Sequence, residues 1–463
     1  MKRIITVIVA ILLVFALAAC GNGTTTPPPE LADPGTGTTA PPPAPADTGG
    51  DKVQLTFSFW GGEQELADTQ AALDLFNGSQ DRIEVVPMQI PWETYIEQLN
   101  VMATGNQLPD VGMINEAGTI AWAEQGMLLD VSDMYASGEP TPLDSLAFKY
   151  QGNTVAYSIA NNILVLYYNK DMFDAAGVDY PPMTADTAWT WDEFVEVAKQ
   201  LTLDSNGNTP NDAGFDKNSI VQYGCMIENL TWQLEQWVVS NGGGFYSADG
   251  SAVTITDPAA IEAIQAVADL YLVHNVAPLS TGLTDDGVQR SLLAGNVAMT
   301  TNGTWGIGAF LAGGEINYDI GVLPYMKQKV TIATGGPAVV FSQTEYPEES
   351  KEFIKWYSSP DNNWGLIGAG IWCPTLESYY TDPALTDKWL NNPNFAPLSD
   401  AKSILVDYQF QYAKSAAWYY SNNALDFNDL LGSVLGAVWT GEKTAEAAIT
   451  EAAANLDAAH AGF

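Results

Sequence analysis

Apolar and polar residues alternate regularly where the foldable part of the chain begins. Over 53–60, apolar side chains occupy every second position, and this period predicts a β-strand with one buried face. Apolar residues at near-helical spacing follow over 66–76. The same succession of strand and helix patterns continues over 83–86, 92–103, 111–114 and 120–125. Strands and helices that alternate through short connections predict an α/β fold, with a parallel sheet covered by helices.

A second group of elements begins after Tyr157. The apolar segment 163–168 predicts a strand, and Thr190 and Glu193 have the spacing of a capping box at a helix start. Amphipathic patterns predict further helices from Pro258, over 349–357 and over 444–456. The chain from 51 to 463 is long enough for two domains of ordinary size.

The order of these elements also predicts where a ligand would bind. In parallel sheets, ligands bind in the crevice beyond the carboxyl ends of the strands. Residues 60–64 and 115–116 directly follow two predicted strands. We therefore expect these two segments at the rim of a cleft.

The first twenty residues indicate export. Lys2 and Arg3 precede an apolar run over 4–19, which is shorter than the roughly 20 residues that a membrane-spanning helix needs, so 1–19 is predicted to be a cleaved signal peptide. The tetrad that ends at Cys20, Leu-Ala-Ala-Cys, resembles the bacterial lipobox. This implies a lipid on the Cys20 sulfur and anchoring at the outer face of the bacterial cytoplasmic membrane. An ordinary signal peptide that contains a cysteine is the alternative.

The next segment, 20–50, has the composition of a tether. It consists almost entirely of Gly, Thr, Pro, Ala, Asp and Asn, with two Pro-Pro-Pro runs, and offers nothing from which to build a core. Such a chain is extended and semi-rigid, with a reach of about 90 Å at about 3 Å per residue. We expect the globular part to begin near Asp51.

The charge of the chain argues against a nucleic-acid-binding protein, and its cysteines leave the presence of a disulfide open. The chain has 17 basic and 55 acidic residues, a net charge of −38, and no basic cluster that would bind nucleic acid phosphates. We therefore expect no nucleic-acid partner, and the charge supports the solubility of an exported protein. Two cysteines remain besides Cys20. Cys225 and Cys373 either form one disulfide or stay buried as thiols, and the sequence leaves both possibilities open.

Four motifs, in this order and spacing, carry a resemblance to a known family. They are Leu-Pro-Asp-Val at 108–111, Leu-Tyr-Tyr-Asn-Lys-Asp-Met-Phe at 166–173, Thr-Trp-Asp-Glu-Phe at 190–194, and the segment 298–305 that ends in Asn-Gly-Thr-Trp. Over 51–463 the chain resembles the family-1 extracellular sugar-binding proteins of bacterial ABC importers, the group that includes maltose-binding protein.

The resemblance implies two α/β lobes, each a sheet flanked by helices, that close on a sugar about a hinge and present it to a membrane permease. The implied lobes are 51–158 with 334–372 and 159–333 with 373–463. The implied crossings between them lie near 157–160, 331–336 and 371–375. A monomer is expected.

A sugar offers apolar faces and a rim of hydroxyl groups, so its binding site needs aromatic rings together with amides or carboxylates. The chain has 14 Trp and 20 Tyr. The candidates among them are chosen by their place in the predicted elements and crossings or in the motifs of the family. Trp305 is the foremost candidate, because it matches the stacking tryptophan of the family and Gly303 leaves room beside its ring. The other predicted ligand-binding residues are Trp60, Glu63, Gln64, Asn115, Glu116, Asn162, Trp232 and Trp372.

For four of these residues a structural role is the alternative. Trp60 would pack beneath the following helix, and Asn162 would bond to backbone at the start of a strand. Trp232, at the start of a helix predicted over 233–239, and Trp372, next to a crossing, would simply pack in the core.

One polar insertion has the spacing of a calcium-binding loop. Oxygen-bearing side chains recur at alternate positions with a glycine at the turn; the candidate ligands are Asp204, Asn206, Asn208, Asp212 and Asp216. Phe215 stands where a full EF-hand has its bidentate Glu. A polar turn rich in Asn and Asp is the alternative to a structural Ca²⁺.

Other function classes receive less support. A glycoside-active enzyme would also place aromatic rings and paired carboxylates in a cleft, but the chain has only two histidines, His274 and His460, and no nucleophile elbow. We therefore expect a binding protein that is not an enzyme and requires no cofactor. A sugar-sensing surface protein that serves a receptor would share the anchor, the tether and the fold.

Overall fold

The structure is a computed structural model, and it describes residues 52–60, 63–91, 94–136, 142–227, 229–279, 291–308, 316–421 and 423–461. Cys20, the predicted signal peptide and the predicted tether lie outside the described residues. By its internal contacts, the chain from Asp51 to Phe463 forms one compact unit. None of the helices in the described part combines the length and the apolar character that crossing a bilayer would require.

The first sheet has the strand order β2-β1-β3-β12-β5-β4. Its strands are β1 (Val53–Phe59), β2 (Ile83–Gln89), β3 (Val111–Met113), β4 (Phe148–Tyr150), β5 (Asn153–Ser158) and β12 (Pro337–Val340). Strands β2, β1 and β3 are parallel, whereas β12, β5 and β4 join antiparallel. The three strands expected from the sequence therefore do form a parallel sheet, and the sheet becomes mixed because a late strand, β12, runs in the opposite direction and pairs with β3.

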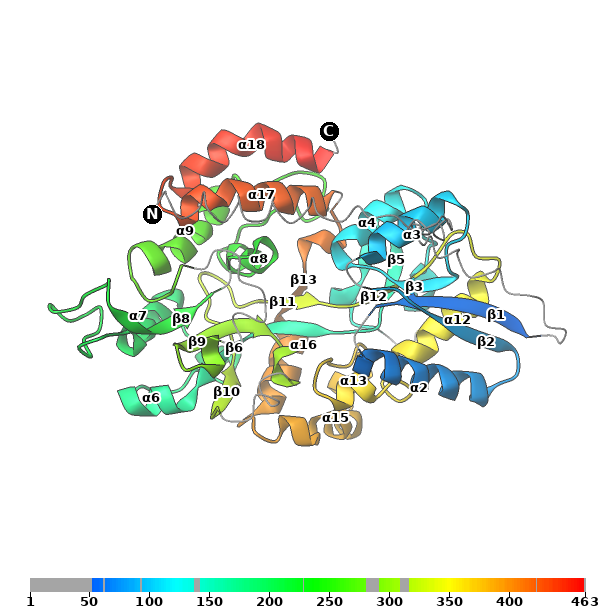
Figure 1. The fold of residues 1–463 in the computed structure, drawn as a ribbon, viewed down its shortest axis with the longest axis horizontal. Helices are drawn as coiled ribbons and strands as arrows, with labels where there is room; N and C mark the ends of the chain where they lie inside the picture. The colour runs from blue at the N-terminus through cyan, green and yellow to red at the C-terminus, as the bar shows by residue number, and fades with distance from the viewer. Residues whose placement is uncertain are drawn as a thin grey trace, which may run out of the picture. The chain divides into compact units, whose positions relative to one another are not determined.

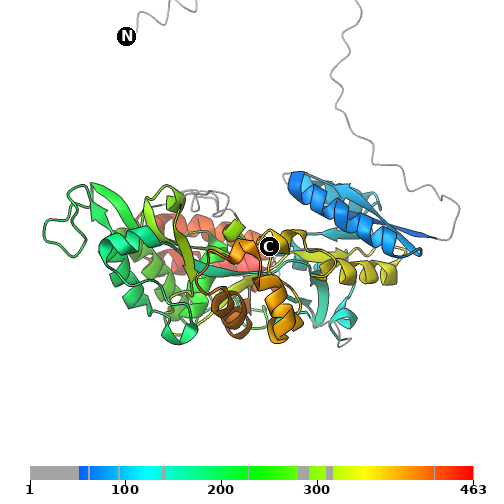
Figure 2. The ribbon, with the colours of Figure 1, turned by 90° about the horizontal axis from the view of Figure 1, so that it is seen from below.

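The second sheet has the strand order β13-β11-β6-β9-β8-β7, and one further strand, β10, pairs with β6. Its strands are β6 (Asn162–Asn169), β7 (Leu203–Asp204), β8 (Ile220–Met226), β9 (Val297–Gly303), β10 (Tyr318–Gly321), β11 (Thr331–Thr334) and β13 (Ala413–Ser415). Figure 2 shows the two sheets side by side, with β1 and β2 in blue in one and the green strands in the other.

Two neighbouring segments carry the chain between the sheets. The chain leaves the first sheet at the end of β5 and enters the second with β6; it returns between β11 and β12. The two segments run antiparallel, and the amide of Ile159 donates to the carbonyl of Gly336 at 2.8 Å. A third segment passes beside them, because the amide of Cys373 donates to the carbonyl of Asn161 at 2.8 Å. The division into the two expected lobes stays a prediction.

Helices cover both faces of the first sheet (Figure 1). α2 (Glu63–Ser79) and α12 (Pro347–Ser358) pack on one face, where Phe353 meets Phe57 and Phe76 with ring centroids 5.3 Å from each. α3 (Tyr95–Thr104) and α4 (Glu116–Glu124) pack on the other. Large apolar side chains on the two opposite faces of the sheet therefore pack against two layers of helices.

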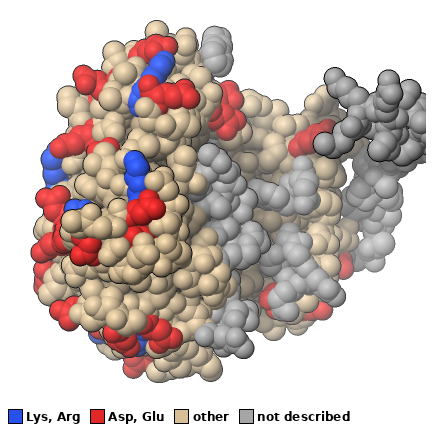
Figure 3. Space-filling model, turned by 60° about the vertical axis from the view of Figure 1, so that its left-hand side comes forward, with Lys and Arg blue, Asp and Glu red and all other residues tan. Residues whose placement is uncertain are grey.

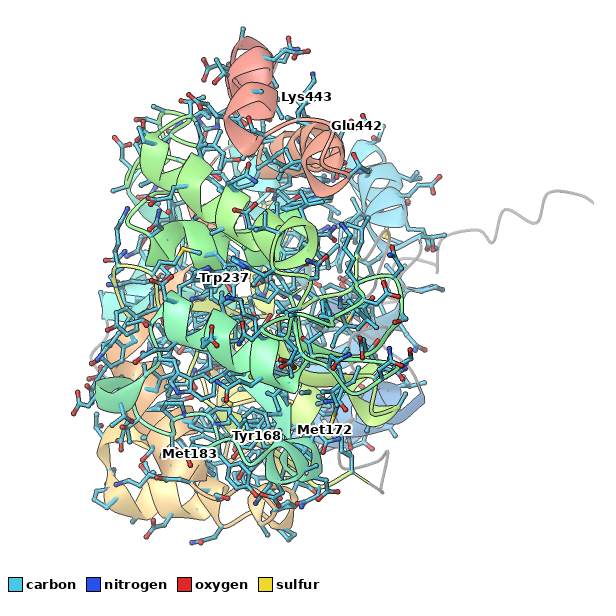
Figure 4. All side chains as sticks on the ribbon, turned by 90° about the vertical axis from the view of Figure 1, so that its left-hand side faces the viewer. Tyr168, Met172, Met183, Trp237, Glu442 and Lys443 are labelled. Carbon is cyan, nitrogen blue, oxygen red and sulfur yellow. The ribbon has the colours of Figure 1, made fainter. Side chains whose placement is uncertain are left out.

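The second sheet is covered in the same way. Figure 4 looks at it from the side of α7 (Trp191–Leu201) and labels two fully buried aromatic residues, Tyr168 of β6 and Trp237 of α8 (Thr231–Ser240). The ring of Trp237 meets that of Trp191 edge-on at 4.9 Å. The remaining α-helices in the part of the chain that the structure describes are α5 (Ser132–Ala136), α6 (Lys170–Ala176), α9 (Pro258–Leu272), α13 (Gly365–Gly368), α14 (Ser378–Thr381), α15 (Pro383–Leu390), α16 (Gln409–Tyr412), α17 (Ala424–Trp439) and α18 (Ala445–Ala461).

Short helical turns complete the fold. Within the described residues, η2 (Asp144–Leu146), η3 (Ala185–Thr187), η4 (Pro393–Phe395) and η6 (Ala417–Tyr419) are 3₁₀ turns, and η5 (Ser403–Tyr408) is a π-helix. The sheets flanked by helices confirm the expected α/β class.

Local signals act as the sequence predicts at two helix starts. At α7 the capping box is complete, because the Thr190 hydroxyl accepts from the Glu193 amide at 3.3 Å while the Glu193 carboxylate accepts from the Thr190 amide at 2.8 Å. At α9, Pro258 occupies the first turn, where its missing N–H leaves no helical hydrogen bond unmade.

Cys225 and Cys373 are both buried free thiols. Of the two possibilities that the sequence left open, the structure therefore has the buried thiols. On the surface, acidic side chains spread over the face shown in Figure 3, with few basic ones between them.

Candidate functional site

Three tryptophans from distant parts of the chain lie in a row. The ring of Trp232, in α8, lies between those of Trp305 and Trp418, with its centroid 6.0 Å from each and interplanar angles of 43° and 33°. All three side chains are half-buried. We call Trp232, Trp305 and Trp418 the aromatic row.

Trp305 takes its place in the row from the end of β9. Its ring lies over Gly303, the last residue of that strand. Between them, the Thr304 hydroxyl donates to the side-chain oxygen of Asn162 at 2.7 Å. Asn162 is 7% exposed and begins β6, so the predicted residues Asn162 and Trp305 are brought together through Thr304.

Trp418 enters the row from η6, a short turn that is held from α8. The Ala417 amide donates to the Glu235 carboxyl at 2.7 Å. Glu235 is 3% exposed, and burial raises its pKa to about 8 although this hydrogen bond acts to lower it. The indole N–H of Trp418 is buried and has no hydrogen-bond partner in the described part of the chain, which is uncommon for a buried donor.

The start of α4 supplies the predicted polar residues Asn115 and Glu116. The Asn115 side chain caps the helix by accepting from the Gly118 amide at 2.9 Å. One oxygen of Glu116, Oε1, accepts from the Gly335 amide at 2.7 Å and from the Tyr419 hydroxyl at 2.5 Å. Burial raises the pKa of Glu116 to about 7, although both hydrogen bonds act to lower it. These residues therefore adjoin the row through Tyr419, the neighbour of Trp418.

Trp60 lies at the same edge of the first sheet but outside the row. Its ring meets that of Tyr95 edge-on, with centroids 4.9 Å apart and an interplanar angle of 81°. The Tyr95 hydroxyl is fixed in turn by the Met113 carbonyl at 2.8 Å. Glu63 and Gln64 begin α2, and their side chains lie outside the described part of the structure.

Trp372 is separate from the row. Its amide donates to the Leu366 carbonyl at 3.2 Å, and its half-buried ring packs against the apolar residues around both α2 and α15. Its role in ligand binding stays a prediction, as it does for the other candidates.

The polar insertion is held together by its own carboxylates. Asp204 is 1% exposed and accepts from the amides of Asn206 at 2.8 Å, Asn208 at 2.9 Å and Asp216 at 3.0 Å. Burial acts to raise the pKa of Asp204, but these bonds outweigh it and lower the pKa to about 2. Asp212 and Asp216 likewise accept from amides within the loop.

These bonds explain the loop without an ion. No cluster of three or more His, Cys, Asp or Glu side chains placed to hold a metal occurs among the residues that the structure describes. The calcium ligands inferred from the sequence therefore stay a prediction.

Sequence reasoning missed Trp418 and Tyr419. The signal that points to them is a run of three aromatic residues, 418–420, in a polar stretch. The run follows no strand of the first sheet, so its approach to α4 depends on tertiary packing alone.

The arrangement brings the apolar faces of three aromatic rings close to amide and carboxyl groups. The faces of such rings are suited to contact with apolar C–H groups. The polar groups around them suit a ligand that carries hydroxyl groups. Among Trp232, Trp305, Trp418, Asn115, Glu116 and Asn162 no side chain is cationic.

Known proteins share both the sequence pattern and the fold. Residues 71–397 match the family described as bacterial extracellular solute-binding protein. The chain is 24% identical over 367 residues to the sn-glycerol-3-phosphate-binding periplasmic protein UgpB of Agrobacterium fabrum, covering 74% of this chain and 78% of that protein. It is 27% identical over 298 residues to the arabinooligosaccharide-binding protein of Halalkalibacterium halodurans, covering 58% of each.

A solved structure agrees with the fold. The ABC substrate-binding protein Lmo0181 from Listeria monocytogenes, in complex with cycloalternan, superposes with a TM-score of 0.68 at 22% identity and covers 89% of this chain and 100% of that one. The family match extends over most of the chain, and the resemblance inferred from the motifs is confirmed. The protein belongs to the bacterial extracellular solute-binding protein family.

Proposed function

We propose that the protein captures a neutral sugar or oligosaccharide outside the cell at the aromatic row and delivers it, chemically unchanged, to the permease of an ABC importer. The observation that carries this proposal is the row itself, three half-buried indole rings at 6.0 Å spacing beside amide and carboxyl groups. Ring faces bind the C–H faces of sugars, and polar groups bind the hydroxyl rim.

Charge favours a neutral ligand over an anionic one. UgpB binds sn-glycerol 3-phosphate by its name, and an anion of that kind requires cationic partners or free backbone amides. No Lys or Arg side chain is among the residues proposed to contact the ligand, which are Trp232, Trp305, Trp418, Asn115 and Asn162. The Halalkalibacterium relative binds arabinooligosaccharides by its name, and Lmo0181 was solved with cycloalternan. Both ligands are neutral carbohydrates, in agreement with this site.

The residues take different roles in this proposal. Trp232, Trp305 and Trp418 stack on the sugar, and Asn162 and Asn115 donate or accept hydrogen bonds at its rim. Bound sugar stabilises the closed arrangement of the two sheets and their helices, because only that arrangement lets residues from both contact it. The sugar then leaves without a covalent step.

A thermal-shift panel tests the proposal. Maltotriose, arabinotriose and glycerol 3-phosphate are titrated, with tryptophan fluorescence recorded alongside. A ligand at a hundred times its dissociation constant adds about 2.7 kcal/mol to the free energy of unfolding. We expect a neutral sugar to raise the melting temperature and to be recovered intact. A rise with glycerol 3-phosphate alone, or cleavage of the sugar, would contradict the proposal.

Attachment to the membrane is part of the proposal and rests on the sequence. We infer that Cys20 carries the lipid and that 21–50 forms the tether, which keeps the binding protein near its permease. Cys20→Ser is expected to move the protein from the membrane fraction to the medium and to reduce sugar uptake while binding in solution is unchanged. Unchanged uptake in cells that lack the permease would instead favour the sensing role.

A further inference from the structure

We propose that Glu116 is a positioning residue that couples the crossing at Gly335 to the turn that holds Trp418. The effect on ligand affinity rests on the proposed function, whereas the coupling itself is a property of the fold. Glu116 would then act through Tyr419 and Gly335.

Glu116 joins three segments through one atom. Its Oε1 accepts from the Gly335 amide at 2.7 Å and from the Tyr419 hydroxyl at 2.5 Å. These partners are 219 and 303 residues away in the sequence. Because both donors share this one acceptor atom, a displacement of the Glu116 carboxyl by either donor alters the geometry of the other bond.

The Gly335 end of this connection lies in the crossing between β11 and β12. The backbone there is closely packed: a Cβ at Gly335 would lie 2.8 Å from the Ala160 carbonyl oxygen, in the adjacent crossing between β5 and β6. Rotation of one sheet relative to the other changes the dihedral angles of such a segment. Such a rotation would therefore move the Gly335 N–H and change its hydrogen bond to Glu116.

The Tyr419 end holds η6. Tyr419 is 0% exposed, and its ring stacks on Phe148 of β4 with centroids 4.0 Å apart and an interplanar angle of 21°. Tyr419 thus fixes one end of η6 on the first sheet. Because a fully buried side chain offers no surface to a ligand, any effect of Tyr419 on affinity must be indirect.

The other end of η6 is fixed from α8. The Ala417 amide donates to Glu235, and α8 also carries Trp232. Trp418 lies between these two attachments, so its ring position relative to Trp232 is set by both. A shift of Tyr419 at Glu116 would tilt η6 and change the spacing of the aromatic row.

The first experiment measures hydrogen exchange in the protein without sugar. Peptides that cover 331–340 and 413–421 are followed in the wild type, Glu116→Ala, Glu116→Gln and Tyr419→Phe. Glu124→Ala, an exposed change at the far end of α4, is the matched control. We expect Glu116→Ala and Tyr419→Phe each to speed exchange in both peptides by about tenfold. Glu116→Gln retains an acceptor oxygen and is expected to exchange like the wild type.

The second experiment measures binding of maltotriose and arabinotriose by tryptophan fluorescence. We expect Glu116→Ala to weaken binding by at least about tenfold and Tyr419→Phe by about fivefold, with the double variant no weaker than Glu116→Ala by more than about twofold. Glu116→Gln should restore most of the affinity. If Glu116→Ala merely loosened the fold, its loss of affinity would add to that of Tyr419→Phe in the double variant. Glu116→Gln would then not restore the affinity.

Two outcomes would overturn the inference. Unchanged exchange over 331–340 in Tyr419→Phe would show that the two bonds are independent. Loss of affinity in Glu116→Gln equal to that in Glu116→Ala, with exchange unchanged in both, would assign Glu116 to direct contact with the sugar. If neither sugar binds the wild type, that result counts against the proposed function, while the exchange data still decide the coupling.

Discussion

The ring of Trp305 occupies the space that a side chain at Gly303 would fill. A Cβ at Gly303 would lie 1.9 Å from Cζ3 of Trp305 and 2.1 Å from Cε3. The backbone has little freedom to retreat, because the Gly303 carbonyl accepts from the buried Tyr167 hydroxyl at 2.8 Å. The glycine therefore sets the position of the tryptophan in the aromatic row.

Gly303→Ala is predicted to displace the Trp305 ring. Since two non-bonded carbon atoms cannot lie 1.9 Å apart, the ring must leave its place over β9. We expect sugar affinity to fall by more than about tenfold and the free energy of unfolding to fall by about 1–3 kcal/mol. Titration by tryptophan fluorescence and thermal melting measure the two effects.

Gly436→Ala is the matched control for that substitution. Gly436 is exposed within α17, and a Cβ there meets nothing within 4 Å. This variant should be about 0.5–1 kcal/mol more stable than the wild type, with unchanged affinity. Normal sugar binding by Gly303→Ala would show that the position of the Trp305 ring is not important.

Trp305→Ala and Trp418→Ala are each predicted to weaken sugar binding by more than about tenfold while the fold is kept, because each removes a stacking surface worth a few kcal/mol at most. Trp356→Ala is the control, since Trp356 is also half-buried but packs against Phe76 on the far side of the first sheet. Calorimetric titration measures the affinities. Full affinity in Trp305→Ala would remove that residue from the site.

The buried carboxyl of Glu235 is predicted to make stability fall as the pH rises. Burial raises its pKa from 4.5 to about 8, so between these values the folded protein binds more protons than the unfolded chain. The free energy of unfolding then decreases with rising pH. The loss begins near pH 4.5 and is complete above about pH 8.

Glu235→Gln removes this titration. We expect the stability of the wild type to decline relative to Glu235→Gln between pH 5 and pH 8 by up to a few kcal/mol, measured by urea denaturation at each pH. Glu124→Gln, exposed on α4, should follow the wild type. A constant difference between wild type and Glu235→Gln across that range would mean that Glu235 does not titrate there.

Asp204→Ala is predicted to lower the free energy of unfolding by about 3 kcal/mol, because three amides lose a charged acceptor. The pKa of Asp204 is lowered to about 2, so its contribution is present above about pH 4 and is lost as the pH falls towards 2. Thermal melting at pH 7 and pH 3 measures this.

The same melts with EDTA decide the calcium prediction. Bound Ca²⁺ requires that EDTA lower the melting temperature of the wild type but not of Asp204→Ala. An equal melting temperature with and without EDTA would leave the loop as a hydrogen-bonded turn.

Patterns among neighbouring residues predicted much of the fold from the sequence. Alternation over 53–60, the capping box at Thr190 and the first-turn proline of α9 each depend on neighbouring residues, and each element formed where it was expected. The mixed character of the sheets was missed, because β12 pairs with β3 across more than 200 residues of sequence.

The sequence by itself determined the α/β class and the family, because local periodicity and the order of motifs can be read along the chain. It also named Trp305 as the foremost candidate for ligand binding, and that role stays a prediction. Only the tertiary structure decided that Trp418 lies beside Trp232 and that Glu116 bonds to Tyr419 and Gly335. Such contacts depend on how segments that are distant in the sequence pack against each other. The spacing of residues along the chain does not show which side chains this packing buries together.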